Sequence, residues 1–265
     1  MTCIQKDSGQ LNYFKYGGGD NALLAFHGFG QNNEIFKGWV KEVGQEYTIY
    51  SFDLFYHGIS QRKNEKLSKE EWKSYLESFL IQEKINSFSI LGFSLGGRFA
   101  IASALALPER TKEITLIAPD GVFLTIWFKL ATNPSIKWIF KYVMLQPNLL
   151  EKLMVFNDKY RIVSPYLGDF VRKELGGHAN RKRVYISWNN FKSLGYSKKQ
   201  LSKLFQEQTF ERRIILGSRD HIIKPEKILP IIQTMGAFKV EVLPLKHHQL
   251  IKPEVAKLIL NPSSK

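Results

Sequence analysis

The sequence predicts an α/β fold, with a mostly parallel central sheet flanked by helices and a helical segment inserted into it. Three observations lead to this prediction. Short, almost wholly apolar runs recur in the first half and again after residue 210, as expected for strands buried on both faces. Helical patterns alternate with these runs, which favours parallel strands joined by crossover helices. The region 123–205 breaks the alternation with helical pieces interrupted by prolines.

The expected elements follow the chain in order. Strands are predicted at 11–16, 22–26, 47–52, 88–91, 114–118, 213–216 and 239–243. Helices are predicted at 34–43, 68–84, 95–107, 226–235 and 253–260. The second helix is the clearest, because Ser68 followed three residues later by Glu71 is a helix-start pattern. We therefore expect residues 1–122 and 206–265 to form the core and residues 123–205 to form an inserted helical cap.

The composition excludes several protein classes. Of 265 residues, 44% are hydrophobic and 23% are charged, which excludes a disordered or collagen-like chain. The single cysteine, Cys3, excludes an intramolecular disulfide and a cysteine-based zinc cluster. No apolar run approaches the roughly 20 residues of a membrane span, and the N-terminus lacks the apolar segment of a signal peptide. We expect a cytoplasmic protein with no metal and no cofactor.

A G-x-S-x-G pentapeptide, Gly92 to Gly96, lies between the strand expected at 88–91 and the helix expected at 95–107. This is the context that a nucleophilic serine requires: a tight strand-to-helix turn that projects the hydroxyl above the sheet. The flanking glycines are needed because side chains there would collide with the neighbouring backbone. Ser94 is therefore the predicted nucleophile.

A nucleophilic serine needs a base, and the base needs an acid that orients it. On a sheet of this kind the acid precedes the histidine along the chain. Asp220 follows the strand expected at 213–216 and is the predicted acid, with Asp120 as the alternative.

Two adjacent histidines, His247 and His248, follow the last predicted strand. Only one of them can be the base, because the side chains of neighbouring residues point in different directions. His248 is favoured because it stands four residues beyond Pro244, at the strand end. We expect its ring within hydrogen-bond reach of Ser94 and Asp220, and His247 is the alternative.

The loop that begins at His27 follows another buried strand and reads His-Gly-Phe-Gly. Its backbone can direct an N–H group at a reacting carbonyl oxygen. The N–H groups of Phe29 and Leu95 are the expected donors of an oxyanion hole. His27 and His57 are expected to be structural loop histidines, and Asp53 is expected to organise its loop by hydrogen bonds.

Four blocks in this order resemble the α/β-hydrolase superfamily, specifically its lidded, esterase-like members. The blocks are HGFG, DLFYHGIS, GFSLGG, and GSRDHIIKP followed by HHQLIKP. The second block departs from the usual D-x-x-G-H-G-x-S, because Tyr56 replaces the glycine before the histidine. The resemblance implies an α/β-hydrolase fold and a triad mechanism. The implied roles are nucleophile for Ser94, base for His248, acid for Asp220, and backbone oxyanion donors for Phe29 and Leu95.

The positive charge is concentrated in the expected cap. The chain has a formal net charge of +14, and residues 123–205 hold 15 Lys and Arg against 4 Asp and Glu, a net +11. The same region holds 15 of the 35 aromatic residues. Basic residues interleaved with aromatic ones suit an acidic partner, such as an acyl carrier protein, or an anionic membrane surface. No nucleic-acid-binding motif is present, so no nucleic-acid partner is expected.

Three functions are compatible with these motifs. The first is a serine carboxylesterase that acts on a small or acyl ester through an acyl-enzyme. The second is a lyase on the same fold, because the serine turn continues to Arg98 and is similar to that of the pyruvate-eliminating enzyme of the menaquinone pathway. The third is a non-catalytic small-molecule receptor, which the intact set of serine, aspartate and histidine disfavours.

Overall fold

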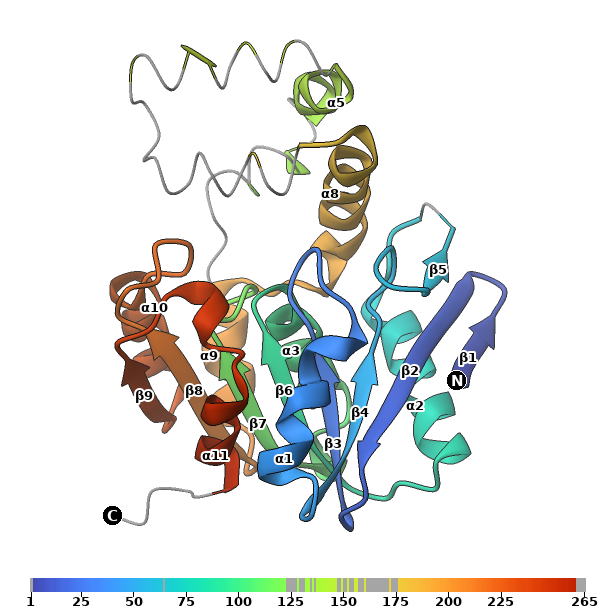
Figure 1. The fold of residues 1–265 in the computed structure, drawn as a ribbon, viewed down its shortest axis with the longest axis vertical. Coiled ribbons are helices and arrows are strands. Elements are labelled where there is room, and N and C mark those ends of the chain that lie inside the picture. The colour runs from blue at the N-terminus through green and yellow to red at the C-terminus, as the bar shows by residue number, and fades with distance from the viewer. Residues whose placement is uncertain are drawn as a thin grey trace. The chain divides into compact units, whose positions relative to one another are not determined.

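The computed structural model in Figure 1 describes most of the chain. The described residues are 2–63, 65–122 and 176–260, together with 128, 132, 133, 135, 137–146, 149, 152, 155, 156, 160 and 172. They belong to two compact units. The first unit consists of Met1–Lys63, Leu67–Phe123 and Leu194–Lys265, and the second of Asn64–Lys66 and Leu124–Ser193.

The first unit is built on a sheet in which the described residues form nine strands (Figure 1). The strands are β1 (Thr2–Lys6), β2 (Gly9–Gly17), β3 (Asn21–Phe26), β4 (Tyr47–Phe52), β5 (Gln61–Arg62), β6 (Phe88–Phe93), β7 (Thr111–Ile117), β8 (Glu211–Gly217) and β9 (Lys239–Leu243). Their order is β1-β2-β4-β3-β6-β7-β8-β9, and β5 pairs with β2. All neighbours from β4 to β9 are parallel, and only the β1, β2 and β5 pairings are antiparallel. The mostly parallel sheet is confirmed, while β1 and β5 were not predicted.

Helices cover both faces of this sheet. They are η1 (Asn33–Trp39), α1 (Val40–Val43), α2 (Lys69–Gln82), α3 (Leu95–Ala106), η2 (Pro108–Arg110), α9 (Lys198–Gln206), α10 (Pro225–Ile232), η4 (Gln233–Met235), η5 (His247–Gln249) and α11 (Pro253–Leu260). Two neighbouring residues of β4 show which helices cover which face, because successive side chains of a strand point to opposite faces of the sheet. Ser51 Oγ donates to the carbonyl of Asn33 in η1, whereas the Phe52 ring packs on Phe79 of α2.

The core under α2 and α3 is aromatic. Phe26 of β3 packs edge-on against Trp72 of α2, and Trp72 in turn packs against Phe99 of α3. The indole N–H of Trp72 donates to Ser103 Oγ at 3.0 Å, so the polar atom of this fully buried ring has a partner. This packing fixes α3 against β3 and β6, the strands whose ends carry the predicted site.

The second unit contains α5 (Lys137–Leu145) and α8 (His178–Phe191). The two helices pack together, and Arg181 Nε of α8 donates to the carbonyl of Met144 at 2.9 Å. Within the described residues, every helix is too short or too polar to cross a lipid bilayer.

The division between the two units differs from the predicted cap at its C-terminal end. Residues 194–205 belong to the first unit, not to the second. The reason is the packing of α9, where Ser202 Oγ and Gln206 Nε2 both donate to the carbonyl of Thr234 in η4. A third helical segment, η3 (Lys192–Leu194), lies at the boundary.

Candidate active site

Ser94 occupies the sharp turn between β6 and α3. Its backbone has φ 50° and ψ −117°, a conformation that few non-glycine residues adopt. Three hydrogen bonds hold it there. Ser94 N donates to Ile117 O at 3.0 Å, and Ser94 O accepts from the N–H groups of Gly97 at 2.9 Å and Asp120 at 2.8 Å. The strained turn is therefore tied to the end of β7.

The glycines that flank Ser94 are needed for close backbone approach. A Cβ at Gly92 would lie 2.6 Å from the Ala100 Cβ, and one at Gly96 would collide with the carbonyl of Phe26. These contacts confirm why the motif carries glycine on both sides: α3 starts directly against the ends of β3 and β6.

Asp220 and His247 form the central polar contact of the site. His247 Nδ1 lies 2.6 Å from Asp220 Oδ2, and the two residues are only 8% and 3% exposed. The other carboxylate oxygen, Oδ1, accepts from the backbone N–H groups of Ile222 at 2.7 Å and Ile223 at 2.9 Å. The carboxylate is thus held on both sides, with one oxygen directed at the imidazole.

The prediction that His248 would contact Asp220 is wrong, because the structure gives this contact to His247. The cause is the 3-10 helix η5, which begins at His247. Lys246 N donates to Gln249 Oε1 at 2.8 Å and Gln249 N donates to Lys246 O at 2.9 Å, which closes the turn. A 3-10 helix rotates by about 120° per residue, so two neighbouring side chains cannot point the same way. In η5 the side chain of His247 is buried and that of His248 is exposed.

Two backbone bonds join the loop that carries the acid to the loop that carries the histidine. Ser218 N donates to Leu243 O at 2.8 Å, and Arg219 N donates to Leu245 O at 3.2 Å. Gly217 permits this approach, since a Cβ there would collide with the Leu245 carbonyl. The position of the histidine is therefore decided by contacts with β8, not by its count from the strand end.

The His247 ring also lies beside the serine turn. It packs against the ring of Phe93, with centroids 5.1 Å apart and planes inclined at 35°. Phe93 directly precedes Ser94. Asp220 and His247 thus lie next to the residue that precedes the strained serine, beyond the C-terminal ends of β8 and β9.

The two expected oxyanion donors flank the same turn. Leu95 is the first residue of α3, where helix N–H groups have no partner within the helix. Phe29 lies in the loop after β3, and the preceding Gly28 comes so close to Phe93 that a Cβ there would lie 3.1 Å from its ring. Both backbone segments therefore border the serine turn.

The loop histidine His27 and the acid Asp53 make hydrogen bonds that connect loop segments. His27 Nδ1 lies 2.7 Å from Gly28 O, while its Nε2 accepts from Leu54 N at 3.0 Å. Asp53 Oδ1 accepts from the backbone and side-chain nitrogens of Asn33 at 2.7 and 2.9 Å. These bonds hold together the loops that follow β3 and β4.

Tyr56, the departure from the usual loop pattern, has φ 66°. This left-handed conformation favours glycine, which accounts for the residue type usual at this position. The Tyr56 hydroxyl donates to Lys63 O at 2.8 Å and so anchors the ring outside the serine turn.

Asp120, the alternative acid, is engaged by Arg98. The Arg98 guanidinium is 1% exposed and makes a bidentate pair with Asp120, in which Nε donates to Oδ2 at 3.3 Å and Nη2 donates to Oδ1 at 3.1 Å. Because the Asp120 N–H donates to Ser94 O, this ion pair secures the backbone of the serine turn. This role was not predicted from the sequence, although Arg98 lies only two residues after the motif and was a visible signal.

We expect Arg98→Met to lower kcat about 10- to 100-fold at nearly constant KM, because a displaced serine turn loses its alignment. Arg213→Met is the matched control, since Arg213 is equally buried and pairs with Glu113 at 3.1 Å within the sheet. Each change should lower the free energy of unfolding by about 2 to 4 kcal/mol by leaving a carboxylate unpaired. Thermal unfolding and kcat measured well below Tm separate the effects. Equal kcat values for the two variants would contradict the positioning role of Arg98.

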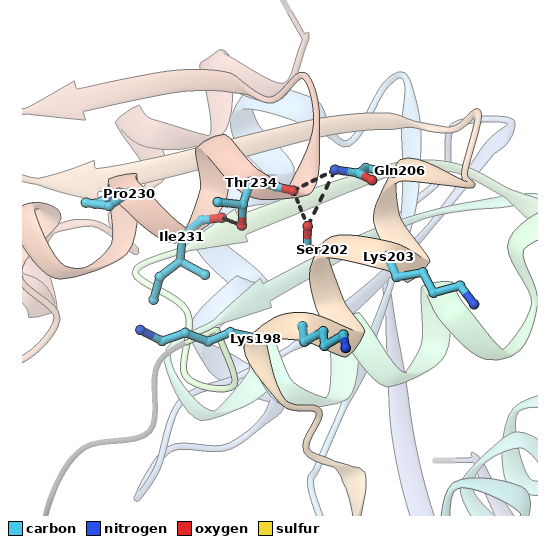
Figure 2. A pocket seen from close by; sticks show the side chains of 8 residues that line it. Lys198, Ser202, Lys203, Gln206, Pro230, Ile231 and Thr234 are labelled. Atoms are coloured by element: carbon cyan, nitrogen blue, oxygen red, sulfur yellow. Dashed lines mark hydrogen bonds between the residues drawn. The ribbon is translucent and has the colours of Figure 1, made fainter.

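A surface groove of about 520 Å³ lies apart from these residues, between α9 and the α10–η4 segment (Figure 2). Polar groups that line the groove bond to one another, because Gln206 Nε2 donates to Thr234 O at 3.0 Å. Figure 2 shows Lys198 and Lys203 pointing in opposite directions, so their ammonium groups do not converge. None of the predicted site residues lines this groove.

Comparison with known proteins identifies the family. A family model described as the alpha/beta hydrolase fold matches residues 21–252. A solved thermophilic esterase from Thermogutta terrifontis superposes with a TM-score of 0.72 at 18% identity, covering 98% of this chain and 97% of that one. A candidate esterase/lipase of Mycoplasma pneumoniae is 28% identical over 214 residues, 77% of this chain and 73% of the relative.

Other curated relatives match a smaller part. The pimeloyl-[acyl-carrier protein] methyl ester esterase of Aliivibrio salmonicida is 27% identical over 111 residues, 42% of this chain and 41% of the relative. In this esterase and in three other curated relatives, the matched region covers between 31% and 41% of the relative's length. The family model covers well over half of the sequence, and the sheet order and serine turn agree with it. The chain therefore belongs to the α/β-hydrolase fold family.

Proposed function

We propose that this protein is a serine hydrolase that cleaves carboxylic esters. The observation that carries the proposal is the buried 2.6 Å contact between Asp220 and His247, beside a serine held at φ 50°. In this proposal Ser94 is the nucleophile, His247 the general base and Asp220 the orienting acid. Phe29 and Leu95 supply the N–H groups of the oxyanion hole.

The contact between Asp220 and His247 sets the direction of proton transfer. An ionised carboxylate only accepts hydrogen bonds, so Nδ1 of His247 carries the hydrogen and Nε2 is the basic nitrogen. Nε2 takes the Ser94 proton as the hydroxyl attacks the ester carbonyl. The two backbone N–H groups stabilise the negative oxygen of the tetrahedral intermediate.

Collapse of this intermediate breaks the bond to the alcohol. The alcohol leaves with the proton from His247, and the acyl group stays on Ser94 as an ester. Water then attacks the acyl-enzyme, with His247 again accepting a proton. The acid product leaves and the serine hydroxyl is restored, so the cycle consumes one water for each ester.

The structure does not favour the lyase alternative. Arg98 was the residue that suggested it, and Arg98 is buried in a bidentate pair with Asp120. An arginine that recognises a substrate carboxylate needs the paired N–H groups of its guanidinium to be available to that carboxylate. Nor does any contact in the described residues favour a receptor that has lost catalysis.

We propose an acyl ester as the substrate. The support is the likeness to esterases, among them one whose name specifies a methyl ester on an acyl carrier protein. We expect turnover of p-nitrophenyl esters to depend on acyl chain length, with an optimum, because an acyl pocket gains binding free energy until it is filled.

A second experiment tests Ser94 as the nucleophile. A fluorophosphonate should inactivate the protein, and mass spectrometry should place one adduct on the peptide that contains Ser94. Turnover without an adduct at Ser94, or no turnover of any ester in the series, would contradict the proposal.

A further inference from the structure

One helix of the second unit exposes an apolar face. On α5, the side chains of Trp138, Tyr142 and Ile139 are 66%, 59% and 46% exposed. Trp138 and Tyr142 are one helical turn apart and Ile139 lies beside them, so the three share one face. Met144, on the opposite side of the helix, is 1% exposed. The helix thus packs through one side and presents aromatic and aliphatic groups on the other.

The polar atom of the exposed tryptophan already has a partner. Trp138 Nε1 donates to Ser135 O at 3.1 Å, just before the helix. Lys141 is exposed on the same side as Trp138 and Tyr142. We refer to Trp138, Ile139, Lys141 and Tyr142 as the α5 face. It combines apolar ring surface with a positive charge, as in residues that sit at a membrane–water boundary.

The surrounding sequence has one sign of charge. No Asp or Glu occurs from 122 to 150, a stretch that contains three lysines. A second exposed apolar group lies in the same unit: Val155, Phe156 and Tyr160 are 64%, 51% and 55% exposed. The rings of Phe156 and Tyr160 pack at 4.5 Å. The segment 151–160 holds two lysines and two acids, so positive charge without acids is particular to the sequence around α5.

Three occupants could cover the α5 face, and these features favour one. An acidic protein would complement Lys141 but would not require exposed tryptophan and tyrosine rings. A second copy of the chain would bring lysines of like charge together, which costs free energy. An anionic bilayer accepts both features, because rings enter the headgroup region while lysines meet lipid phosphates.

We propose that the α5 face binds the surface of anionic lipid bilayers. With nine residues, α5 is about 13 Å long, too short to span a bilayer, so it would lie along the interface. The proposal goes beyond ester hydrolysis and does not depend on it, because membrane binding is measured without turnover.

Sedimentation with sucrose-loaded vesicles tests this proposal on the full chain. We expect binding to vesicles of phosphatidylglycerol and phosphatidylcholine, weak binding to phosphatidylcholine alone, and loss of binding as salt is raised. Trp138→Ala with Tyr142→Ala removes the rings and keeps the charge. Lys141→Glu reverses the charge and keeps the rings. Each variant should weaken the partition coefficient about tenfold or more.

Two matched controls lie in the first unit. Ile81→Ala removes an isolated apolar side chain that is 76% exposed on α2, and Lys41→Glu reverses an exposed lysine of α1. Neither should alter vesicle binding, and thermal unfolding checks that all variants are folded. The proposal is overturned if the α5 variants bind vesicles as the wild type does, or if the controls weaken binding equally. It is also overturned if the wild type binds only an acidic carrier protein, or forms an α5-dependent dimer, without binding vesicles.

Discussion

Replacing Ser94 by alanine is expected to lower kcat for ester hydrolysis by roughly four to six orders of magnitude, because it removes the proposed nucleophile. Alanine keeps a Cβ at the strained position, and the bonds that hold the turn come from the backbone of Ser94. The midpoint of thermal unfolding should therefore stay within a few degrees of the wild-type value. The measurements are steady-state hydrolysis of a p-nitrophenyl ester and a thermal unfolding curve.

Ser218→Ala is the matched control for this experiment. Ser218 is an exposed serine in the acid-bearing loop, and its bond to Leu243 uses the backbone N–H, which alanine retains. Its kcat should remain within about twofold of the wild-type value, as is usual for surface changes. If Ser94→Ala retained more than a few per cent of the activity, Ser94 could not be the nucleophile.

The second large effect distinguishes the two adjacent histidines. His247→Ala is expected to lower kcat by roughly three orders of magnitude or more, because it removes the ring held by Asp220. His248→Ala should change kcat less than about threefold, since this side chain is exposed. The two variants differ by one position and delete the same group, so each is the control for the other.

Steady-state hydrolysis of the same p-nitrophenyl ester by the two variants measures this difference. A large loss in His248→Ala together with a mild one in His247→Ala would restore the original sequence-based choice and refute the geometry of η5.

Much of the fold could be predicted from the sequence because it depends on local patterns. The short, largely apolar runs that became β3, β4, β6 and β8 need only their own residues and the turns that bound them. The strand β1, Thr2–Lys6, was not predicted, because its mixed residues form a strand only by pairing with β2. The region 34–43 became a 3-10 helix followed by a single α-helical turn, not one α-helix.

The serine turn was likewise determined locally. Gly92 and Gly96 are required because a side chain at either position would collide with α3 or with the end of β3. The pentapeptide by itself therefore predicts the position of Ser94. The position of Asp220 could be predicted in the same way, because a loop directly after a buried parallel strand opens at one known edge of the sheet.

Only the tertiary structure decided between His247 and His248. The bonds of Ser218 to Leu243 and of Arg219 to Leu245 position the backbone that leads into the 3-10 turn, and they join segments 25 or more residues apart. The role of Asp120 was decided in the same way, by Arg98 across the serine turn. The hydrogen bonds of α9 to Thr234 likewise decided that this helix belongs to the first unit. The sequence by itself determined the buried strands and which serine occupies the turn, because steric constraints act between neighbours in the chain. The choice of histidine and of ion-pair partner depends on contacts between distant segments, which exist only once the sheet is assembled.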